Sequence, residues 1–250
     1  YAVLGMHTDA DGGLWVRSLQ PGALSVTVLE AKTGKRVAEL THIEIEEVEG
    51  FFEGLMPRRR RSFPYRLRIV WQEGVQETDD PYRFPTVLGE MDVWLLAEGS
   101  HLRPFERLGA HLCEIDGVPG TAFAVWAPDA QRVSVVGDFN TWDGRRHPMR
   151  LRRECGVLEI FLPGVGAGAH YKYEIRARDG YLLPLKSDPY GFQAEMRPST
   201  ASMVCDLPEP VEPTPVAAGD ELGAPLSVYE VHLASWRRAD DGGFPDWQRL

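Results

Sequence analysis

The chain has 250 residues, a length that suits two domains, and its 43% hydrophobic and 26% charged residues are typical of folded proteins rather than disordered ones. Its formal charge of −10 disfavours nucleic acid as a partner, because phosphate binding requires a basic surface. No apolar run approaches the roughly 20 residues needed to cross a bilayer, so we expect no contact with a membrane through a spanning helix.

The chain starts at Tyr1, with neither an initiator methionine nor the basic-then-apolar pattern of a signal peptide, so we expect it to be a piece of a longer protein. The three cysteines lie far apart and form no CxxC pair. Because an odd number cannot close a disulfide framework, we expect reduced cysteines in a cytoplasmic protein. They are Cys113, Cys155 and Cys205.

Residues 1–88 are predicted to form a first β-sandwich. Runs such as residues 25–29, which read SVTVL, alternate with period two, as expected of strands with one buried face. Pro21-Gly22 and Thr33-Gly34 supply turns between them. The four arginines at 58–61 fall between two such runs, which favours a solvated turn over a phosphate-binding patch.

Residues 89–107 differ from their surroundings and are predicted to be a helical connector. Their large apolar residues are spaced more like helix turns than like strand positions. These residues, with Leu108 at the boundary, are Met91, Trp94, Leu95, Leu102 and Phe105.

Residues 108–206 repeat the first module. LGMH at 4–7 recurs as LGAH at 108–111, and DPYRF at 80–84 recurs as DPYGF at 188–192. Between these ends, YRLRI at 65–69 matches YKYEI at 171–175. The constant order predicts two immunoglobulin-like sandwiches in tandem, each built of short strands between turns.

The composition changes after Asp206. Residues 207–225 contain five prolines and are predicted to be an extended linker. Residues 226–233 then read LSVYEVHL, a near-continuous apolar strand typical of a parallel sheet that continues downstream. We therefore assign 226–250 to the beginning of a further domain.

The motifs together resemble one enzyme family. GDFNTWDGRRHPM at 137–149, FAVWAP at 123–128, KSDPY at 186–190 and YEVHLASWRR at 229–238 resemble, in this order, the glycogen (1,4-α-glucan) branching enzymes. The resemblance implies a mainly β chain: two sandwich modules, the second of the glycogen-binding type, followed by the first strand of an α-amylase-type (β/α)8 barrel that is otherwise absent.

The same resemblance implies a function for the parent protein. It would cut an α-1,4 glucan and rejoin the segment through an α-1,6 bond by retaining chemistry, in which one carboxylate is the nucleophile and another the acid and base. The family's catalytic carboxylates come from later barrel strands, so we assign no catalytic residue here. The implied partners are an α-glucan and the downstream barrel, and we expect no cofactor and no metal site.

Three residues are predicted to contact sugar. An indole offers a flat apolar face to a glucose ring, and Trp142 lies in a loop with no obvious core role. Lys172 points outward in the alternation Tyr171-Lys172-Tyr173, while Asn140 could bind hydroxyl groups or shape its own turn. Relatives that bind glucan carry a second tryptophan at the position of Leu182. We therefore expect either a weak site with a single platform or a module that serves mainly as a structural partner of the barrel.

Other aromatic and histidine residues are interpreted as structural. Periodicity assigns Phe123, Trp126, Tyr171 and Tyr173 to the core, and the recurring His7 and His111 to packing or capping. Two further functions remain open: a non-catalytic glucan-binding or regulatory protein, and a debranching hydrolase with a related sandwich. The strand at 226–233 favours an enzyme over a binding protein, since an apolar strand with an unpaired edge serves no purpose outside a sheet.

Overall fold

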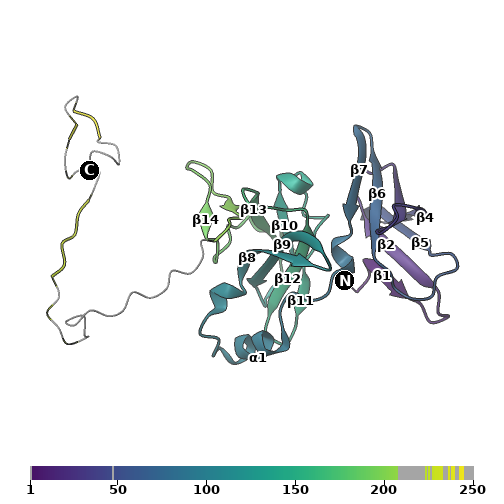
Figure 1. Cartoon of the computed structure of the whole chain (residues 1–250), viewed down its shortest axis with the longest axis horizontal. Helices are drawn as coiled ribbons and strands as arrows, with labels where there is room; N and C mark the ends of the chain where they lie inside the picture. Colours follow the sequence, from purple (N-terminus) through teal and green to yellow (C-terminus); the bar gives the residue numbers. More distant parts are fainter. Residues whose placement is uncertain are drawn as a thin grey trace. The chain divides into compact units, whose positions relative to one another are not determined.

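The computed structural model describes residues 2–46 and 48–207, and isolated positions beyond them at 223, 225, 227–232, 236, 238–239 and 242–244. The chain divides into two compact units, Tyr1–Leu207 and Pro208–Leu250. The first unit is mainly β and contains two sandwich modules joined by a helical connector (Figure 1). No helix in the described part of the chain is long and apolar enough to cross a membrane.

The N-terminal module is a sandwich of seven antiparallel strands in the order β1-β2-β5-β4-β3-β6-β7. The long strand β4 belongs to both layers, because Arg36 to Leu40 pair with β3 whereas Thr41 to Ile45 pair with β5. Its strands are β1 (Gly5–Thr8), β2 (Leu14–Leu19), β3 (Ser25–Glu30), β4 (Arg36–Ile45), β5 (Val48–Leu55), β6 (Tyr65–Trp71) and β7 (Gly74–Asp79).

The apolar residues of the alternating runs form the core of this module. Every second residue of β6, from Tyr65 through Leu67 to Ile69, is buried, and β2 and β3 contribute their buried faces in the same way. Arg58–Arg61 lie in the turn between β5 and β6, as the sequence predicts, and Arg58 has a φ of 59°.

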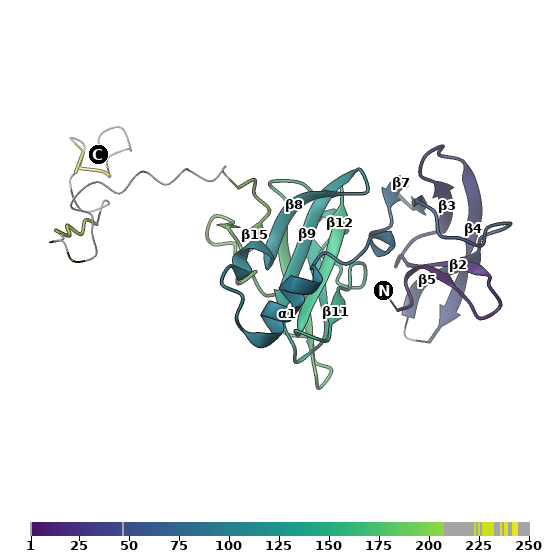
Figure 2. The same ribbon diagram turned by 60° about the horizontal axis from the view of Figure 1, so that its bottom comes forward.

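The connector covers one face of the second module. It consists of the helix α1 (Glu90–Glu98) and the 3-10 turn η2 (Pro104–Glu106), and it follows the 3-10 turn η1 (Pro81–Arg83) at the end of the first module. The helix ends at Gly99, which has a left-handed backbone conformation. The backbone N–H groups at this cap donate to the carbonyl oxygens of Leu95 and Leu96. Figure 2 shows α1 beside the sheet that contains β9, β12 and β11. Leu88 and Val93 pack there against Ala124 and Val157 of this sheet.

The second module is a sandwich of two four-stranded sheets, ordered β11-β12-β9-β8 and β10-β13-β15-β14. Phe123, Val135 and Tyr171 meet in the core between them. The strands are β8 (Gly109–Ile115), β9 (Val118–Trp126), β10 (Ala130–Gly137), β11 (Arg150–Arg152), β12 (Val157–Pro163), β13 (His170–Ala177), β14 (Gln193–Ala194) and β15 (Ser202–Met203).

The two modules repeat each other down to single hydrogen bonds. Tyr65 donates its hydroxyl proton to the carboxylate of Asp80 at 2.5 Å, and Tyr171 does the same to Asp188 at 2.7 Å. Likewise, Nε2 of His7 and Nε2 of His111 each lie within hydrogen-bonding distance of the backbone carbonyl three residues earlier, at 2.9 and 3.0 Å. The recurring histidines are therefore structural, as the sequence analysis expects.

Two other recurring residues explain the shared LG and DPY motifs. Gly5 and Gly109 have φ angles of 95° and 104°, which disfavour any residue with a Cβ. A Cβ on either glycine would also lie 2.9 Å from the carbonyl oxygen of the motif tyrosine, Tyr82 or Tyr190. The tyrosine backbone thus closes each module against its glycine.

The predicted strand at 226–233 is not formed in the described residues 227–232, which have no regular secondary structure. A strand is stabilised by hydrogen bonds to a neighbouring strand, and none is present beside these residues in the described part of the unit. Most of the predicted linker at 207–225 and of the segment 233–250 lies outside the described residues.

Candidate functional site

The motif loop between β10 and β11 carries two of the three predicted sugar-binding residues. It begins with a 3-10 turn, η3 (Asp138–Asn140), in which Asn140 is buried. Its Oδ1 accepts from the Gly137 N–H at 3.0 Å, and its Nδ2 donates to the Val135 carbonyl and to His147 Nδ1, both at 2.8 Å. All polar atoms of the Asn140 amide are thus used inside the loop. These contacts fit the second role left open for Asn140, that of shaping its own turn, whereas sugar binding by Asn140 stays a prediction.

Trp142 is held in a fixed orientation and is partly exposed. Its backbone, at a φ of 59°, donates to the Gly137 carbonyl at 2.9 Å, and its indole Nε1 donates to Asp138 Oδ1 at 2.8 Å. Left-handed backbone is costly for a bulky residue and persists only where its surroundings enforce it. The loop therefore presents an aromatic ring with little freedom left to lose on binding.

The loop folds over the outward face of β13. Gly144 lies so close to Glu174 that a Cβ at Gly144 would overlap the carboxylate, which also forms an ion pair with Arg132. Lys172, two residues earlier on the same face, is partly exposed and donates from Nζ to Thr200 Oγ1 at 2.7 Å. It pairs with Val136, the neighbour of the Gly137 that holds Trp142. The sheet register thus brings Lys172 and Trp142 to the same end of one sheet.

The position where a second tryptophan is expected lies on a hairpin beside β13. Leu182 bridges to Arg176, and the Leu183 N–H donates to the Ile175 carbonyl at 2.9 Å. Leu182 is 53% exposed and its neighbour Tyr181 is 73% exposed. The hairpin therefore offers an exposed aromatic residue, but not the broad indole ring of a second platform.

The assignment of Trp126 to the core is wrong, because its side chain is 62% exposed. Trp126 is three residues after Phe123, and side chains an odd number of positions apart lie on opposite faces of a strand. Phe123 faces the sandwich core, whereas Trp126 follows Ala124 on the face covered by the connector and lies at its open end. The predictions for Phe123, Tyr171 and Tyr173 are confirmed, each being fully buried.

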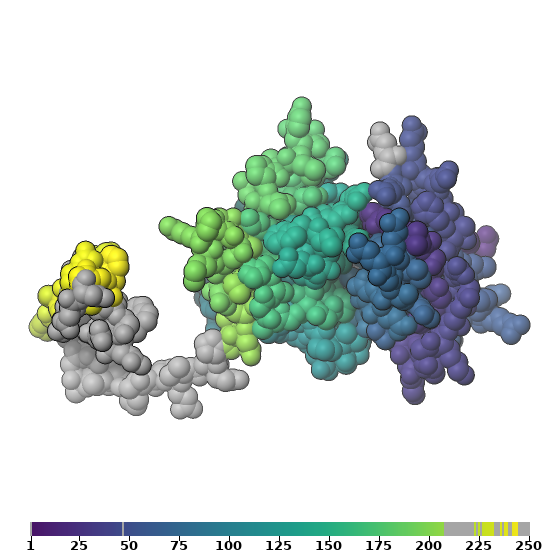
Figure 3. Space-filling view, turned by 90° about the horizontal axis from the view of Figure 1, so that it is seen from above, coloured from purple at the N-terminus to yellow at the C-terminus, as the bar shows by residue number. Residues whose placement is uncertain are grey.

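The far side of the motif loop contacts the N-terminal module, which the sequence analysis does not anticipate. The Arg146 guanidinium lies over the Trp71 ring, 4.4 Å from its centroid, and Tyr82 donates its hydroxyl proton to the Pro148 carbonyl at 3.2 Å. Arg145 forms an exposed ion pair with Glu49 at 2.8 Å. Figure 3 shows the purple-to-blue module in contact with the teal one.

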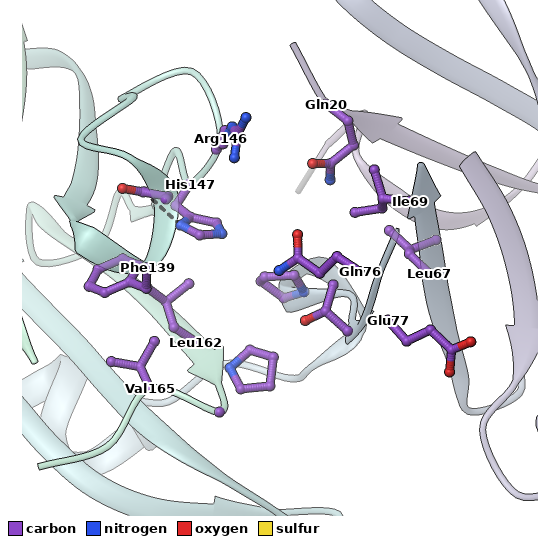
Figure 4. A pocket seen from close by; sticks show the side chains of 15 residues that line it. Gln20, Leu67, Ile69, Gln76, Glu77, Phe139, Arg146, His147, Leu162 and Val165 are labelled. Atoms are coloured by element: carbon purple, nitrogen blue, oxygen red, sulfur yellow. Dashed lines mark hydrogen bonds between the residues drawn. The ribbon is translucent and has the colours of Figure 1, made fainter. Parts of the chain in front are cut away.

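A cavity of about 370 Å³ lies at this contact (Figure 4). His147 borders it, and burial together with the nearby charge of Arg146 lowers the His147 pKa to about 4. Because Asn140 donates to Nδ1, the neutral ring carries its proton on Nε2. The lining from the second module includes Phe139, Arg146, His147, Leu162 and Val165, and that from the first includes Gln20, Leu67, Ile69, Gln76 and Glu77.

Within the described ranges, no group of three or more His, Cys, Asp and Glu side chains is arranged to hold a metal ion. The groups around Trp142 are an aromatic face, the ammonium group of Lys172 and backbone polar groups. Such a combination suits a neutral, polyhydroxylated ligand.

Comparison with protein families assigns both modules. Residues 1–82 match the model of the N-terminal domain of the alpha-1,4-glucan branching enzyme, and residues 107–191 match carbohydrate-binding module 48, the isoamylase N-terminal domain. The two matches in this order support the N-terminal part of a glucan branching enzyme, as the sequence motifs predict.

Several solved structures share a limited likeness with the chain. A pullulanase from Anoxybacillus sp. LM18-11 is 17% identical at a TM-score of 0.33, over 83% of this chain and 29% of that one. PulA from Klebsiella pneumoniae is 19% identical at a TM-score of 0.35, over 82% and 21%. Likenesses at this level carry no conclusion about function, and the chain spans less than a third of these proteins' length.

Proposed function

With a branching-enzyme N-terminal domain followed by a carbohydrate-binding module 48 domain as the premise, we propose that this chain is the glucan-anchoring front part of a glycogen branching enzyme. In this proposal the second module binds α-1,4-glucan chains at Trp142, on the end of the β10-β13 sheet. The first module supports the loop that carries this residue.

The fixed indole of Trp142 is the observation that carries the proposal. Its ring is oriented by the Asp138 carboxylate and by its own backbone hydrogen bond to Gly137. A rigid aromatic ring binds with a smaller loss of conformational entropy than a mobile one. It can stack on the CH face of a glucose unit, while Lys172 donates hydrogen bonds to hydroxyl groups after exchanging its contact with Thr200.

Native electrophoresis through a gel containing glycogen tests this site. We expect glycogen to retard the wild-type chain and the Trp94→Ala variant, which loses an exposed tryptophan on α1, and to leave Trp142→Ala at the mobility of the glycogen-free gel. Retardation of Trp142→Ala equal to that of Trp94→Ala would remove Trp142 from the site. Equal mobility of all three proteins with and without glycogen would mean that the modules only support the rest of the enzyme.

For the longer protein we propose cleavage of an α-1,4 bond and transfer of the segment to a 6-hydroxyl group by retaining chemistry. The catalytic carboxylates would then belong to a downstream barrel, where active sites lie at the carboxyl ends of the strands. Incubation of amylose with the longer protein should produce new α-1,6 linkages without a matching rise in reducing ends. A rise in reducing ends alone would contradict transferase activity.

A debranching hydrolase is the second candidate, because the family model that matches residues 107–191 is also the isoamylase N-terminal domain. The match of residues 1–82 to a branching-enzyme domain favours branching over debranching. Release of linear chains from glycogen by the longer protein would reverse this order. Absence of both reactions would favour the third candidate, a non-catalytic glucan-binding or regulatory protein.

A further inference from the structure

A second cavity opens at the contact between the two modules. It measures about 630 Å³, within the range of small-molecule sites, and it shares Gln76, Phe139 and Arg146 with the cavity of Figure 4. We call it the inter-module cleft and define it by six of its lining residues: Trp71, Glu73, Gln76, Phe139, Thr141 and Arg146.

Trp71 provides an aromatic surface in this cleft. It is the last residue of β6 and continues the core-facing series of Leu67 and Ile69, but at the strand end its ring is only partly buried. Its Nε1 donates to Gln76 Oε1 at 3.2 Å, and the Arg146 guanidinium lies over the ring. The side chain is therefore held in place from both modules, as Trp142 is held within its loop.

Polar groups around Trp71 have unused hydrogen-bonding capacity. The Arg146 Nε is buried without a hydrogen-bond partner in the described residues, while its Nη2 donates weakly to the Pro21 carbonyl at 3.4 Å. A buried donor without a partner is costly, so an acceptor that reaches it after a shift of the Arg146 side chain is favoured. The exposed Glu73 carboxylate, also unpaired among the described side chains, offers an acceptor at the hairpin of β6 and β7.

The chemistry of the cleft suits a neutral sugar. An aromatic ring, one guanidinium donor, one carboxylate and an amide match the CH face and the hydroxyl groups of a glucose unit, each of which both donates and accepts. Glu73 and the overall charge of −10 disfavour an anionic ligand. The largely polar rim gives no continuous apolar wall for a lipid or an aromatic ligand.

The cleft adjoins the segment of the motif loop that carries Trp142. Thr141 lines the cleft and directly precedes Trp142, so the two Cα atoms lie about 3.8 Å apart. A glucan chain stacked on Trp142 therefore has one end within reach of the cleft. The position of Leu182, where a second tryptophan is expected, contributes no such platform.

We propose that the inter-module cleft is a second subsite for the same α-glucan chain, with Trp71 of the N-terminal module as its platform. The inference rests on the proposed function, because it extends the site at Trp142. It predicts that the N-terminal module contributes directly to binding of long chains, and that short oligosaccharides do not use this contribution.

Titration calorimetry with maltotriose and maltoheptaose tests the proposal on the whole 250-residue chain. We expect Trp71→Ala to weaken maltoheptaose binding by about fivefold or more and maltotriose binding by less than about twofold. Glu73→Ala, which removes no contact between the modules, should weaken maltoheptaose alone by about twofold or more. Trp94→Ala is the matched control and should bind both sugars as the wild type does.

The outcomes separate the cleft from the site at Trp142. Equal losses for both sugars in Trp71→Ala, with Glu73→Ala unchanged, would mean that Trp71 only positions the motif loop, and the subsite would be refuted. Unchanged affinity in both variants would identify the cleft as a solvated contact. Loss of all binding in Trp142→Ala, with wild-type affinity in Trp71→Ala and Glu73→Ala, would support the site at Trp142 and refute the cleft subsite. Binding that survives Trp142→Ala but not Trp71→Ala would support the cleft subsite and refute the site at Trp142.

Discussion

The buried carboxylate of Asp188 is the residue whose removal should destabilise the second module most clearly. It accepts hydrogen bonds from the hydroxyl groups of Tyr171 and Tyr173 at 2.7 and 2.9 Å and from the Tyr190 N–H at 2.8 Å. Burial raises the pKa of Asp188 and also raises the pKa values of both tyrosines. The Asp188→Ala variant therefore leaves two fully buried hydroxyl groups without their acceptor.

The cost of this change can be estimated from the two hydroxyl groups. Each buried donor that loses its partner costs about 1–3 kcal/mol, so we expect Asp188→Ala to lower the free energy of unfolding by about 4 kcal/mol. The first module contains a matched control. Asp80 also accepts from a backbone N–H, that of Tyr82, but from only one tyrosine hydroxyl group, that of Tyr65, because Leu67 stands where the second module has Tyr173. Asp80→Ala should therefore cost about 2 kcal/mol.

Urea unfolding followed by circular dichroism and tryptophan fluorescence measures both changes, with separate transitions fitted if the two modules unfold independently. A double variant sharpens the test. Tyr173→Phe should destabilise the wild type by about 1 kcal/mol but should be neutral or stabilising in the Asp188→Ala background, because it removes an unsatisfied hydroxyl. Equal costs for Asp80→Ala and Asp188→Ala, with additive Tyr173→Phe, would refute the reasoning.

Two further predictions concern stability. His147 has a pKa near 4 when folded and about 6.5 when unfolded, so it stabilises the fold above pH 6.5 and this contribution falls between pH 6.5 and 4. At pH 5 the loss relative to pH 7 should be about 2 kcal/mol, and His147→Gln should abolish that part of the urea-midpoint shift. Gly109→Ala should cost about 2–4 kcal/mol in thermal or urea unfolding, because of its positive φ and the Tyr190 carbonyl, whereas Gly117→Ala, at positive φ in open space, should cost about 1 kcal/mol. Similar costs for both glycines would show that the contact with Tyr190 does not matter.

Much of the fold was predictable because its signals are local or repeated. The period-two runs placed the buried faces of the strands, and the recurring LG and DPY motifs marked where each module closes. The repeat also predicted matching structural roles for His7 and His111, which the two carbonyl contacts confirm.

The wrong assignment of Trp126 and the undecided role of Asn140 both depend on how the chain covers these residues after folding. Trp126 is a large hydrophobic residue of the kind that usually lies in a core. It stands at the end of its strand, however, where the connector does not cover its side chain. Asn140 is polar and in a loop, but the loop closes on itself through His147 and buries the amide. Neither outcome follows from local pattern alone, since both depend on how the chain returns over its own strands.

The contact between the modules was missed for a similar reason. Arg145 and Arg146 read as part of a motif in the second module, and nothing in their spacing indicates Glu49 or Trp71 as partners. One signal was available: Trp71 continues the core-facing alternation of β6 to the end of the strand, where its ring is only partly buried against the core.

The indole N–H signal of Trp142 in a nitrogen-15 correlation spectrum tests the central claim most directly. Trp142→Phe identifies the signal by its disappearance, and maltoheptaose is then titrated into the wild-type chain. We predict that the Trp142 signal shifts in a saturable manner, because a sugar stacked on the ring would lie beside the Nε1–H group, which is hydrogen-bonded to Asp138. The Trp94 signal should stay in place. A saturable shift of other indole signals with Trp142 unmoved, or no shift at any sugar concentration, would contradict glucan binding at this loop.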